Sequence, residues 1–185
     1  MRSKQTLIPL AFFTRMLIAS VIFAGFTAAS PNLLQAQIQT KASFGDWQVN
    51  CGKPPGAKQQ RCALVQRVID EERSNVGLRV VFLLTSDGQK VLRVVAPLGV
   101  LLPFGLGLRI DDEPIGKEPL PFIRCRPMGC ISEIVVKDKL LDKFKSGTTA
   151  MFIIVETKEE GRAIPVSLKG FTQGLDRLTV LSKTN

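Results

Sequence analysis

The sequence predicts an all-β protein: one β-sandwich of about eight or nine short strands, with one or two short helices. Short runs rich in β-branched and other apolar residues recur along the chain, and clusters of glycine, proline and charged residues separate them. A hairpin signal lies near the middle of the chain. Four prolines between Pro103 and Pro121 also limit any helix there. These three features together favour packed sheets.

The first predicted strand is residues 44–51, FGDWQVNC, where polar and apolar residues alternate around the only tryptophan. Residues 52–61, GKPPGAKQQR, are turn formers and charges, so they predict a loop. Strand character resumes at residues 62–70, CALVQRVID, and residues 71–77, EERSNVG, turn the chain again.

The clearest local signal is residues 78–97, LRVVFLLTSDGQKVLRVVAP, where two apolar runs flank Asp87-Gly88. This pair suits the positive backbone angles of a type I′ hairpin. A two-residue turn predicts that Leu84 faces Val91 and that Phe82 faces Arg93. Both faces of the hairpin are then largely apolar, so we expect another part of the chain, a partner or a ligand to cover the second face.

An uncharged stretch, APLGVLLPFGLGL, follows at residues 96–108. It lacks the third glycine of a dinucleotide motif and any Gly-Lys-Ser/Thr, so an apolar loop that fills the core or meets a partner is the better interpretation. Residues 108–122 continue as strand, turn and strand. The candidate apolar binding loop comprises Leu98, Val100, Leu101, Leu102, Phe104 and Leu106.

The last third of the chain predicts both helices. Residues 131–138, ISEIVVKD, suit a strand, and residues 137–147, KDKLLDKFKSG, suit a short helix whose C-cap is Gly147. Residues 148–156 and 162–170 predict another hairpin. Residues 171–181, FTQGLDRLTVL, predict a closing helix, which Gly174 weakens.

The N-terminus predicts export. Residues 1–29 contain three basic residues and no acidic one, and the apolar run MLIASVIFAGF is too short for a comfortable membrane span. We expect a cleaved signal peptide over residues 1–29, a polar lead over residues 30–43 and one sandwich domain over residues 44–181. An uncleaved N-terminal anchor is the alternative to a signal peptide, because apolar character extends back to Leu7, and cleavage after Ala36 is the alternative to cleavage after Ala29. No transmembrane segment is expected in the mature chain, which stays basic.

Composition excludes several kinds of active site. The chain has no histidine, so it cannot host a Ser-His-Asp triad, a histidine base or a histidine-containing zinc site. It has no tyrosine, and no serine is followed by lysine three positions later. We therefore expect no enzyme, no cofactor and no metal.

Four cysteines in a small exported domain predict two disulfides. Of the three connectivities, we favour Cys51 with Cys62 and Cys125 with Cys130, because each pair borders a loop rich in proline and glycine that can bring its ends together. Zinc binding is the weaker alternative because the spacings do not fit, and thiol exchange is weaker because Cys-x-x-Cys is missing.

These residues, in this order, resemble a known family. FGDWQVNC, APLGVLLPFGLGLRID, PFIRCRPMGC and IPVSLKGF are similar to segments of the invasion-associated locus B family of exported proteins, over about residues 44–178. The resemblance implies an immunoglobulin-like β-sandwich in the periplasm or envelope, the same cysteine pairing and, in some pathogenic members, a role in host-cell entry. It implies no catalytic residues.

The function we expect is therefore binding of a protein or envelope component in the periplasm, at the outer membrane or after secretion. A homodimer would be one way to cover the second hairpin face. The alternative is a cell-wall glycan hydrolase that uses Asp111 and Glu113, although such a pair before a turn is usually solvated. Lipid binding through the lysines of the helix at residues 137–147 is weaker because aspartates interleave with them, and scarce aromatic residues argue against nucleic acid.

Overall fold

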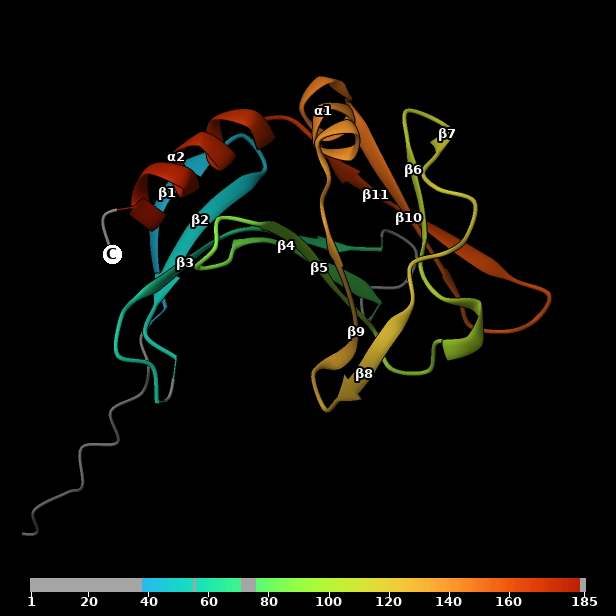
Figure 1. Cartoon of the computed structure of the whole chain (residues 1–185). Helices are drawn as coiled ribbons and strands as arrows, with labels where there is room; N and C mark the ends of the chain where they lie inside the picture. The colour runs from blue at the N-terminus through green and yellow to red at the C-terminus, as the bar shows by residue number, and fades with distance from the viewer. Residues whose placement is uncertain (1–37, 55, 71–75, 184–185) are drawn as a thin grey trace, which may run out of the picture. The chain divides into compact units, whose positions relative to one another are not determined.

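A computed structural model describes residues 38–54, 56–70 and 76–183 as a mostly β protein with two antiparallel sheets (Figure 1). The described elements belong to one unit, Ala36–Asn185. The predicted signal peptide and residues 30–37 of the predicted lead lie outside the described residues. The end of that lead is already part of the first strand, Gln39–Phe44, and the last helix extends to Lys183.

The first sheet has seven strands in the order β1-β2-β3-β4-β5-β9-β8. Five consecutive strands are therefore neighbours, followed by one hairpin in reverse order. An immunoglobulin-like order is not shown by these strands, since that fold places distant segments side by side in two sheets. The bounds are β1 Gln39–Phe44, β2 Trp47–Gly52, β3 Arg61–Ile69, β4 Gly77–Leu84, β5 Lys90–Ala96, β8 Phe122–Arg126 and β9 Gly129–Val135.

The second sheet has four strands in the order β11-β10-β6-β7. Its strands are β6 Gly107–Ile110, β7 Glu113–Pro114, β10 Thr149–Val155 and β11 Gly161–Ser167. The described residues thus contain eleven strands where the sequence predicted eight or nine. The count differs because β1 falls in the predicted lead and because β7 is only two residues long.

Both α-helices lie on one side of the seven-stranded sheet (Figure 1). Helix α1, Asp138–Ser146, buries Leu141 and Phe144, and helix α2, Phe171–Lys183, buries Phe171, Leu175 and Leu178. A short 3₁₀ turn, η1, spans Leu102–Phe104. Within the described residues, no helix is long and apolar enough to cross a membrane.

The core lies between the helices, the second sheet and the inner face of the first sheet. Its largest members stack edge to face: Phe82 lies 4.7 Å from Phe171 and 5.1 Å from Phe144 between ring centroids, and Trp47 lies 5.3 Å from Phe171. The indole of Trp47 donates a hydrogen bond to the carbonyl of Ser167 at 2.9 Å. These contacts bring together strands and helices that are far apart in sequence.

The two glycines that the sequence placed in or after helices have packing roles. A Cβ at Gly174 would lie 2.5 Å from Leu64 Cδ1, so the glycine lets α2 approach β3 closely. Gly147 follows α1 with an extended backbone, φ −76°, and not with the left-handed conformation expected of a glycine C-cap. A Cβ there would lie 2.6 Å from Ile110 Cγ2, so the site needs glycine for space.

The predicted hairpin exists, but its predicted register is wrong by one residue. In the structure Leu83 pairs with Val91, Val81 with Arg93 and Phe82 with Leu92. The turn is wider than the two residues Asp87-Gly88, because the amide of Thr85 donates to the carbonyl of Gln89 at 3.0 Å and the Gln89 amide donates back to the Thr85 hydroxyl. Side-chain hydrogen bonding by threonine thus fixes the loop length.

Both disulfides join neighbouring antiparallel strands of the first sheet. Cys51 of β2 is bonded to Cys62 of β3, with Cα atoms 4.0 Å apart, and Cys125 of β8 is bonded to Cys130 of β9, with Cα atoms 3.9 Å apart. This pairing is the one that the loops predicted. In each disulfide the two cysteines are directly opposite each other on adjacent strands, so each bond links strands that are already paired by backbone hydrogen bonds.

Candidate functional site

The face of the seven-stranded sheet opposite the helices carries a groove, which we call the outer groove. It arises from strand alternation: in β3 the even-numbered residues Leu64 and Gln66 point into the core, so the odd-numbered residues point outward. The same alternation in β4 and β5 continues this surface. The groove has a volume of about 810 Å³ and is lined by residues from β2, β3, β4, β5 and β9.

The floor of the outer groove is aliphatic. Val65 pairs with Val81, and Ala63 with Leu83, which in turn pairs with Val91. Val81 and Val91 are 9% and 7% exposed, whereas Ala63, Val65 and Leu83 remain partly open to solvent. No aromatic side chain is among the described residues that line the groove. The floor of the groove is therefore apolar and partly buried.

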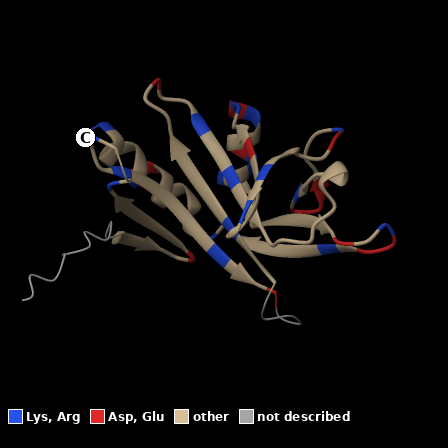
Figure 2. Ribbon diagram, turned by 90° about the horizontal axis from the view of Figure 1, so that it is seen from below, with Lys and Arg blue, Asp and Glu red and all other residues tan. Residues whose placement is uncertain are grey.

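Basic side chains surround this floor. Lys53, Arg61, Arg67, Arg79 and Arg93 line the groove, against one acidic side chain, Glu133. Arg93 forms an ion pair with Glu133 across β5 and β9 at 2.6 Å. Figure 2 shows Lys and Arg, in blue, on several strands, while Asp and Glu, in red, lie mostly in turns and helices. The groove thus carries an excess of positive charge.

Arg67 and Arg79 are direct cross-strand partners in the β3–β4 register. Like charges directly opposite each other destabilise a sheet. Partial burial, together with the positive charge of Arg67, lowers the pKa of Arg79 from its usual value. Among the described residues no carboxylate pairs with either guanidinium, and the Nε of Arg79 is buried without a hydrogen-bond partner, as is the Oδ1 of Asn50 at the same groove.

The outer groove is the second face of the predicted hairpin. The sequence placed apolar residues on both faces, and the structure buries Val80 and Phe82 in the core while Val81 and Leu83 face outward. Neither α-helix covers that outward face (Figure 1). Among the described residues, therefore, no helix covers the second face of the hairpin.

The structure divides the predicted apolar binding loop. Val100 and Leu106 are buried in the core, Leu101 is half-buried, and its amide donates to the Val155 carbonyl at 2.7 Å. The other three members are exposed: Leu98 at 57%, Leu102 at 48% and Phe104 at 43%. The loop therefore anchors the connection between the two sheets and presents three apolar side chains to solvent.

Asp111 and Glu113 are held in structural contacts. The carboxylate of Asp111 accepts hydrogen bonds from the amides of Thr148 and Thr149 at 2.9 to 3.0 Å, which ties the turn after β6 to the start of β10. Glu113 forms an ion pair with Lys143 of α1. Neither carboxylate lies in the outer groove. The geometry gives no observation in favour of acid–base catalysis by this pair.

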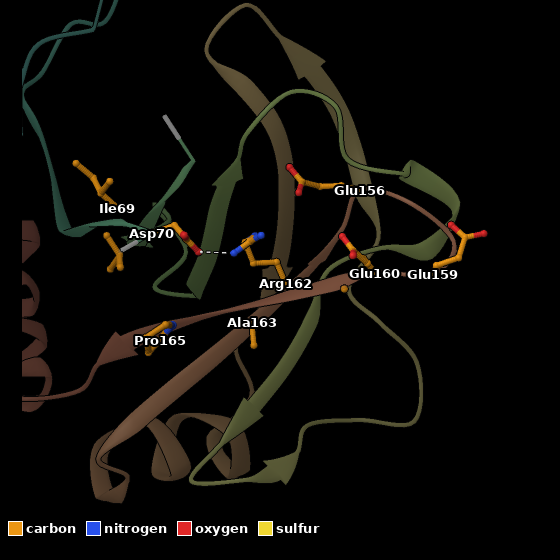
Figure 3. Close-up of a pocket in the computed structure, with 10 residues that line it drawn as sticks. Ile69, Asp70, Glu156, Glu159, Glu160, Arg162, Ala163 and Pro165 are labelled. Carbon is orange, nitrogen blue, oxygen red and sulfur yellow. Dashed lines mark hydrogen bonds and ion pairs between the residues drawn. The ribbon is translucent and has the colours of Figure 1, made fainter. Parts of the chain in front are cut away.

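A second hollow lies where β3 ends beside β10 and β11, and its charge is mostly acidic (Figure 3). Asp70 and Arg162 point toward each other and form an ion pair at 3.4 Å. Glu156, Glu159 and Glu160 come from the loop between β10 and β11 and point in different directions. Within the described residues, no group of three or more potential ligands is placed to hold a metal ion.

Comparison with known proteins decides the family. Residues 47–179 match the family described as "Invasion associated locus B (IalB) protein". The chain is also 31% identical over 185 residues to "Invasion protein B homolog BAB1_0368" of Brucella abortus, covering 95% of this chain and 96% of that protein. The chain belongs to the IalB family.

Two further comparisons agree with this membership. The IalB-family chain is 27% identical over 159 residues to "Invasion protein B" of Bartonella bacilliformis, covering 84% of this chain and 82% of that protein. The crystal structure of invasion associated protein B from Bartonella henselae superposes with a TM-score of 0.66 at 22% identity, covering 80% of this chain and 99% of that one. The second comparison shows a shared fold.

Sequence reasoning predicted the second apolar face of the hairpin in this IalB-family chain but missed the basic side chains around it, although a signal was present. In β3 the outward positions read Arg61, Ala63, Val65 and Arg67, an apolar pair between two arginines at strand spacing. This pattern is informative only when it is known which residues of each strand point outward. The predicted register put Arg93 opposite Phe82, which hid the alignment of the arginines on one face.

Proposed function

We propose that this IalB-family chain is an exported, non-enzymatic envelope protein that acts by binding another macromolecule through the outer groove. The observation that carries this proposal is an aliphatic sheet face, bordered by five basic side chains, that no described helix covers. A partly exposed apolar surface with a charged border is typical of a site where another macromolecule binds.

The cellular location we propose is the periplasm, the outer membrane or the medium after secretion. Two disulfides support an oxidising compartment, because such bonds rarely persist in a reducing cytosol. The N-terminal sequence with basic residues before a short apolar run supports export by a cleaved signal peptide.

A binding role agrees better with this chain than hydrolysis of cell-wall glycan. The chain offers no histidine or tyrosine, and the candidate acid, Asp111, is an acceptor for two backbone amides. Relatives are called invasion protein B, and we propose that the binding partner of this chain takes part in contact with a host cell.

Site-specific photo-crosslinking in intact cells tests this proposal. A photoreactive residue in place of Leu83 reports on the outer groove, the same residue in place of Leu102 reports on the predicted apolar loop, and Lys158 in the β10–β11 turn provides the background. We expect discrete protein adducts from position 83. Adducts from position 102 alone would move the binding surface to the loop, and no adducts above the level at position 158 would contradict the proposal.

A further inference from the structure

We infer that the outer groove binds an acidic, amphipathic segment of another protein, whose aliphatic side chains lie on the groove floor and whose carboxylates contact Arg67 and Arg79. This inference rests on the proposed binding function and names the chemistry of the partner. Three features of the groove carry it: the charge of the two arginines, the composition of the floor and the length of the surface.

The positions of the two arginines favour binding of an anion. Arg67 and Arg79 stand directly opposite each other on β3 and β4, and within the described residues neither guanidinium has an acidic partner. The buried Nε of Arg79 also lacks an acceptor. A carboxylate between them would accept charge-assisted hydrogen bonds from both and remove their mutual repulsion. The neighbouring Arg93 already forms an ion pair with Glu133, so Arg67 and Arg79 are the directly opposed groove arginines that lack an acidic partner among the described residues.

The floor favours aliphatic side chains over sugars or bases. Its side chains are alanine, valine and leucine, and no described aromatic residue is present on which a sugar ring or a base could stack. It is also too open for a single acyl chain, because Ala63, Val65 and Leu83 stay partly exposed, whereas small-molecule sites enclose most of their ligand. A protein segment that rests on one side of the groove suits this half-open surface.

The length of the surface requires more than one anchoring charge. Arg61 and Arg67 lie at the two ends of the apolar pair on β3, six residues apart, which is about 20 Å along a strand. A helix needs about 13 residues to cover that distance. The expected occupant is therefore an amphipathic segment of about this length, with carboxylates at both edges of an aliphatic stripe.

Fluorescence anisotropy with defined peptides tests the inference. The probe is a labelled helical peptide of about 14 residues with leucines on one face flanked by glutamates, and the control peptide has glutamine at every glutamate position. The protein is the oxidised chain purified after export. We expect saturable binding of the glutamate peptide that weakens with added salt, and binding of the glutamine peptide at least tenfold weaker.

Matched variants locate the binding. Arg67→Gln with Arg79→Gln removes two positive charges from the groove, and Arg124→Gln with Arg126→Gln removes the same number from β8 of the same sheet. We expect at least a tenfold loss of peptide affinity in the first pair and less than a twofold change in the second. If the double variant of Arg67 and Arg79 does not fold, the single variant Arg67→Gln is measured in its place, because Arg67 is exposed.

Other outcomes overturn the inference separately from the proposed function. If both variant pairs bind the peptide with equal affinity and crosslinking from position 83 is unchanged, the acidic partner is rejected. The proposed macromolecular binding through the groove then still stands. Binding to phosphatidylglycerol vesicles without binding to the peptide would assign the groove to a lipid surface. Concentration-dependent dimerisation that the groove variants abolish would assign it to a second copy of this chain.

Discussion

At the scale of single residues, the structure separates apolar side chains that maintain the fold from those that are free to make contacts. Phe171 is fully buried and touches the rings of Trp47, Phe82 and Phe144. Phe104, in the loop that the sequence marked for binding, is 43% exposed. Both are phenylalanines in apolar segments, so composition alone could not rank them.

Truncating these two phenylalanines should have very different effects on stability. We expect Phe171→Ala to lower the free energy of unfolding by about 3 to 5 kcal/mol, because it removes a buried ring and leaves a cavity. Phe104→Ala should change it by less than about 0.5 kcal/mol. Denaturant unfolding followed by the fluorescence of Trp47 measures both, and equal losses would contradict the placement of these rings.

Two glycines that both have a positive φ test how closely neighbouring segments of the chain approach each other. Gly170 and Gly99 have positive φ values of 87° and 97°, but a Cβ at Gly170 would lie 2.0 Å from the Phe44 carbonyl oxygen, while nothing lies within 4 Å of one at Gly99. We expect Gly99→Ala to cost about 1 to 2 kcal/mol from backbone strain alone. Gly170→Ala should cost about 1 to 3 kcal/mol more. Comparable thermal shifts in the two variants would show that the close approach is absent.

At the scale of elements, the sequence predicted which segments are strands better than how they pair. Alternation located β2 and β3, and the apolar runs located β4 and β5, because each strand repeats its pattern locally. The β4–β5 register depended on hydrogen bonds of Thr85 within the turn, which the Asp87-Gly88 signal did not reveal. An error of one residue exchanges the two faces of a strand, so the sequence indicated a second apolar face but not the arginines that line it.

The disulfides offer a direct test of strand pairing. Under non-reducing conditions trypsin should cleave after Arg61 and leave two peptides joined through Cys51 and Cys62. It should not cleave between Arg126 and Pro127, so Cys125 and Cys130 should remain within one peptide that contains an internal bond. Mass spectrometry before and after reduction identifies both species. Peptides that join Cys51 to Cys125 or Cys130 would contradict the β2–β3 and β8–β9 pairings.

At the scale of the whole molecule, positive charge and apolar surface coincide on one sheet face. The chain has a formal net charge of +9, which at the level of composition indicates only a bias toward acidic partners. The fold concentrates part of that charge around the aliphatic floor, whereas three glutamates gather in the β10–β11 turn. Composition predicts only the sign of the charge that we propose for the partner, whereas the register of the sheet shows where the basic side chains gather.

Export and stability are linked through the two disulfides, which join β2 to β3 and β8 to β9 in the first sheet. Loops closed over separations of 11 and 5 residues should contribute about 5 kcal/mol in total through the unfolded chain. That is comparable with the whole net stability of a small domain, about 5 to 15 kcal/mol. A chain retained in a reducing compartment should therefore be marginally stable, and its apolar groove would then favour aggregation.

Guanidinium unfolding of the oxidised and fully reduced chains measures this link. We expect reduction to lower the free energy of unfolding by about 5 kcal/mol, and replacement of only Cys125 and Cys130 by serine to lower it by about 2 kcal/mol. The smaller loss is expected because the second loop is shorter. If the reduced chain is as stable as the oxidised one, or if four free thiols are titrated in the protein recovered from cells, the disulfides do not stabilise the fold and export is not required for folding.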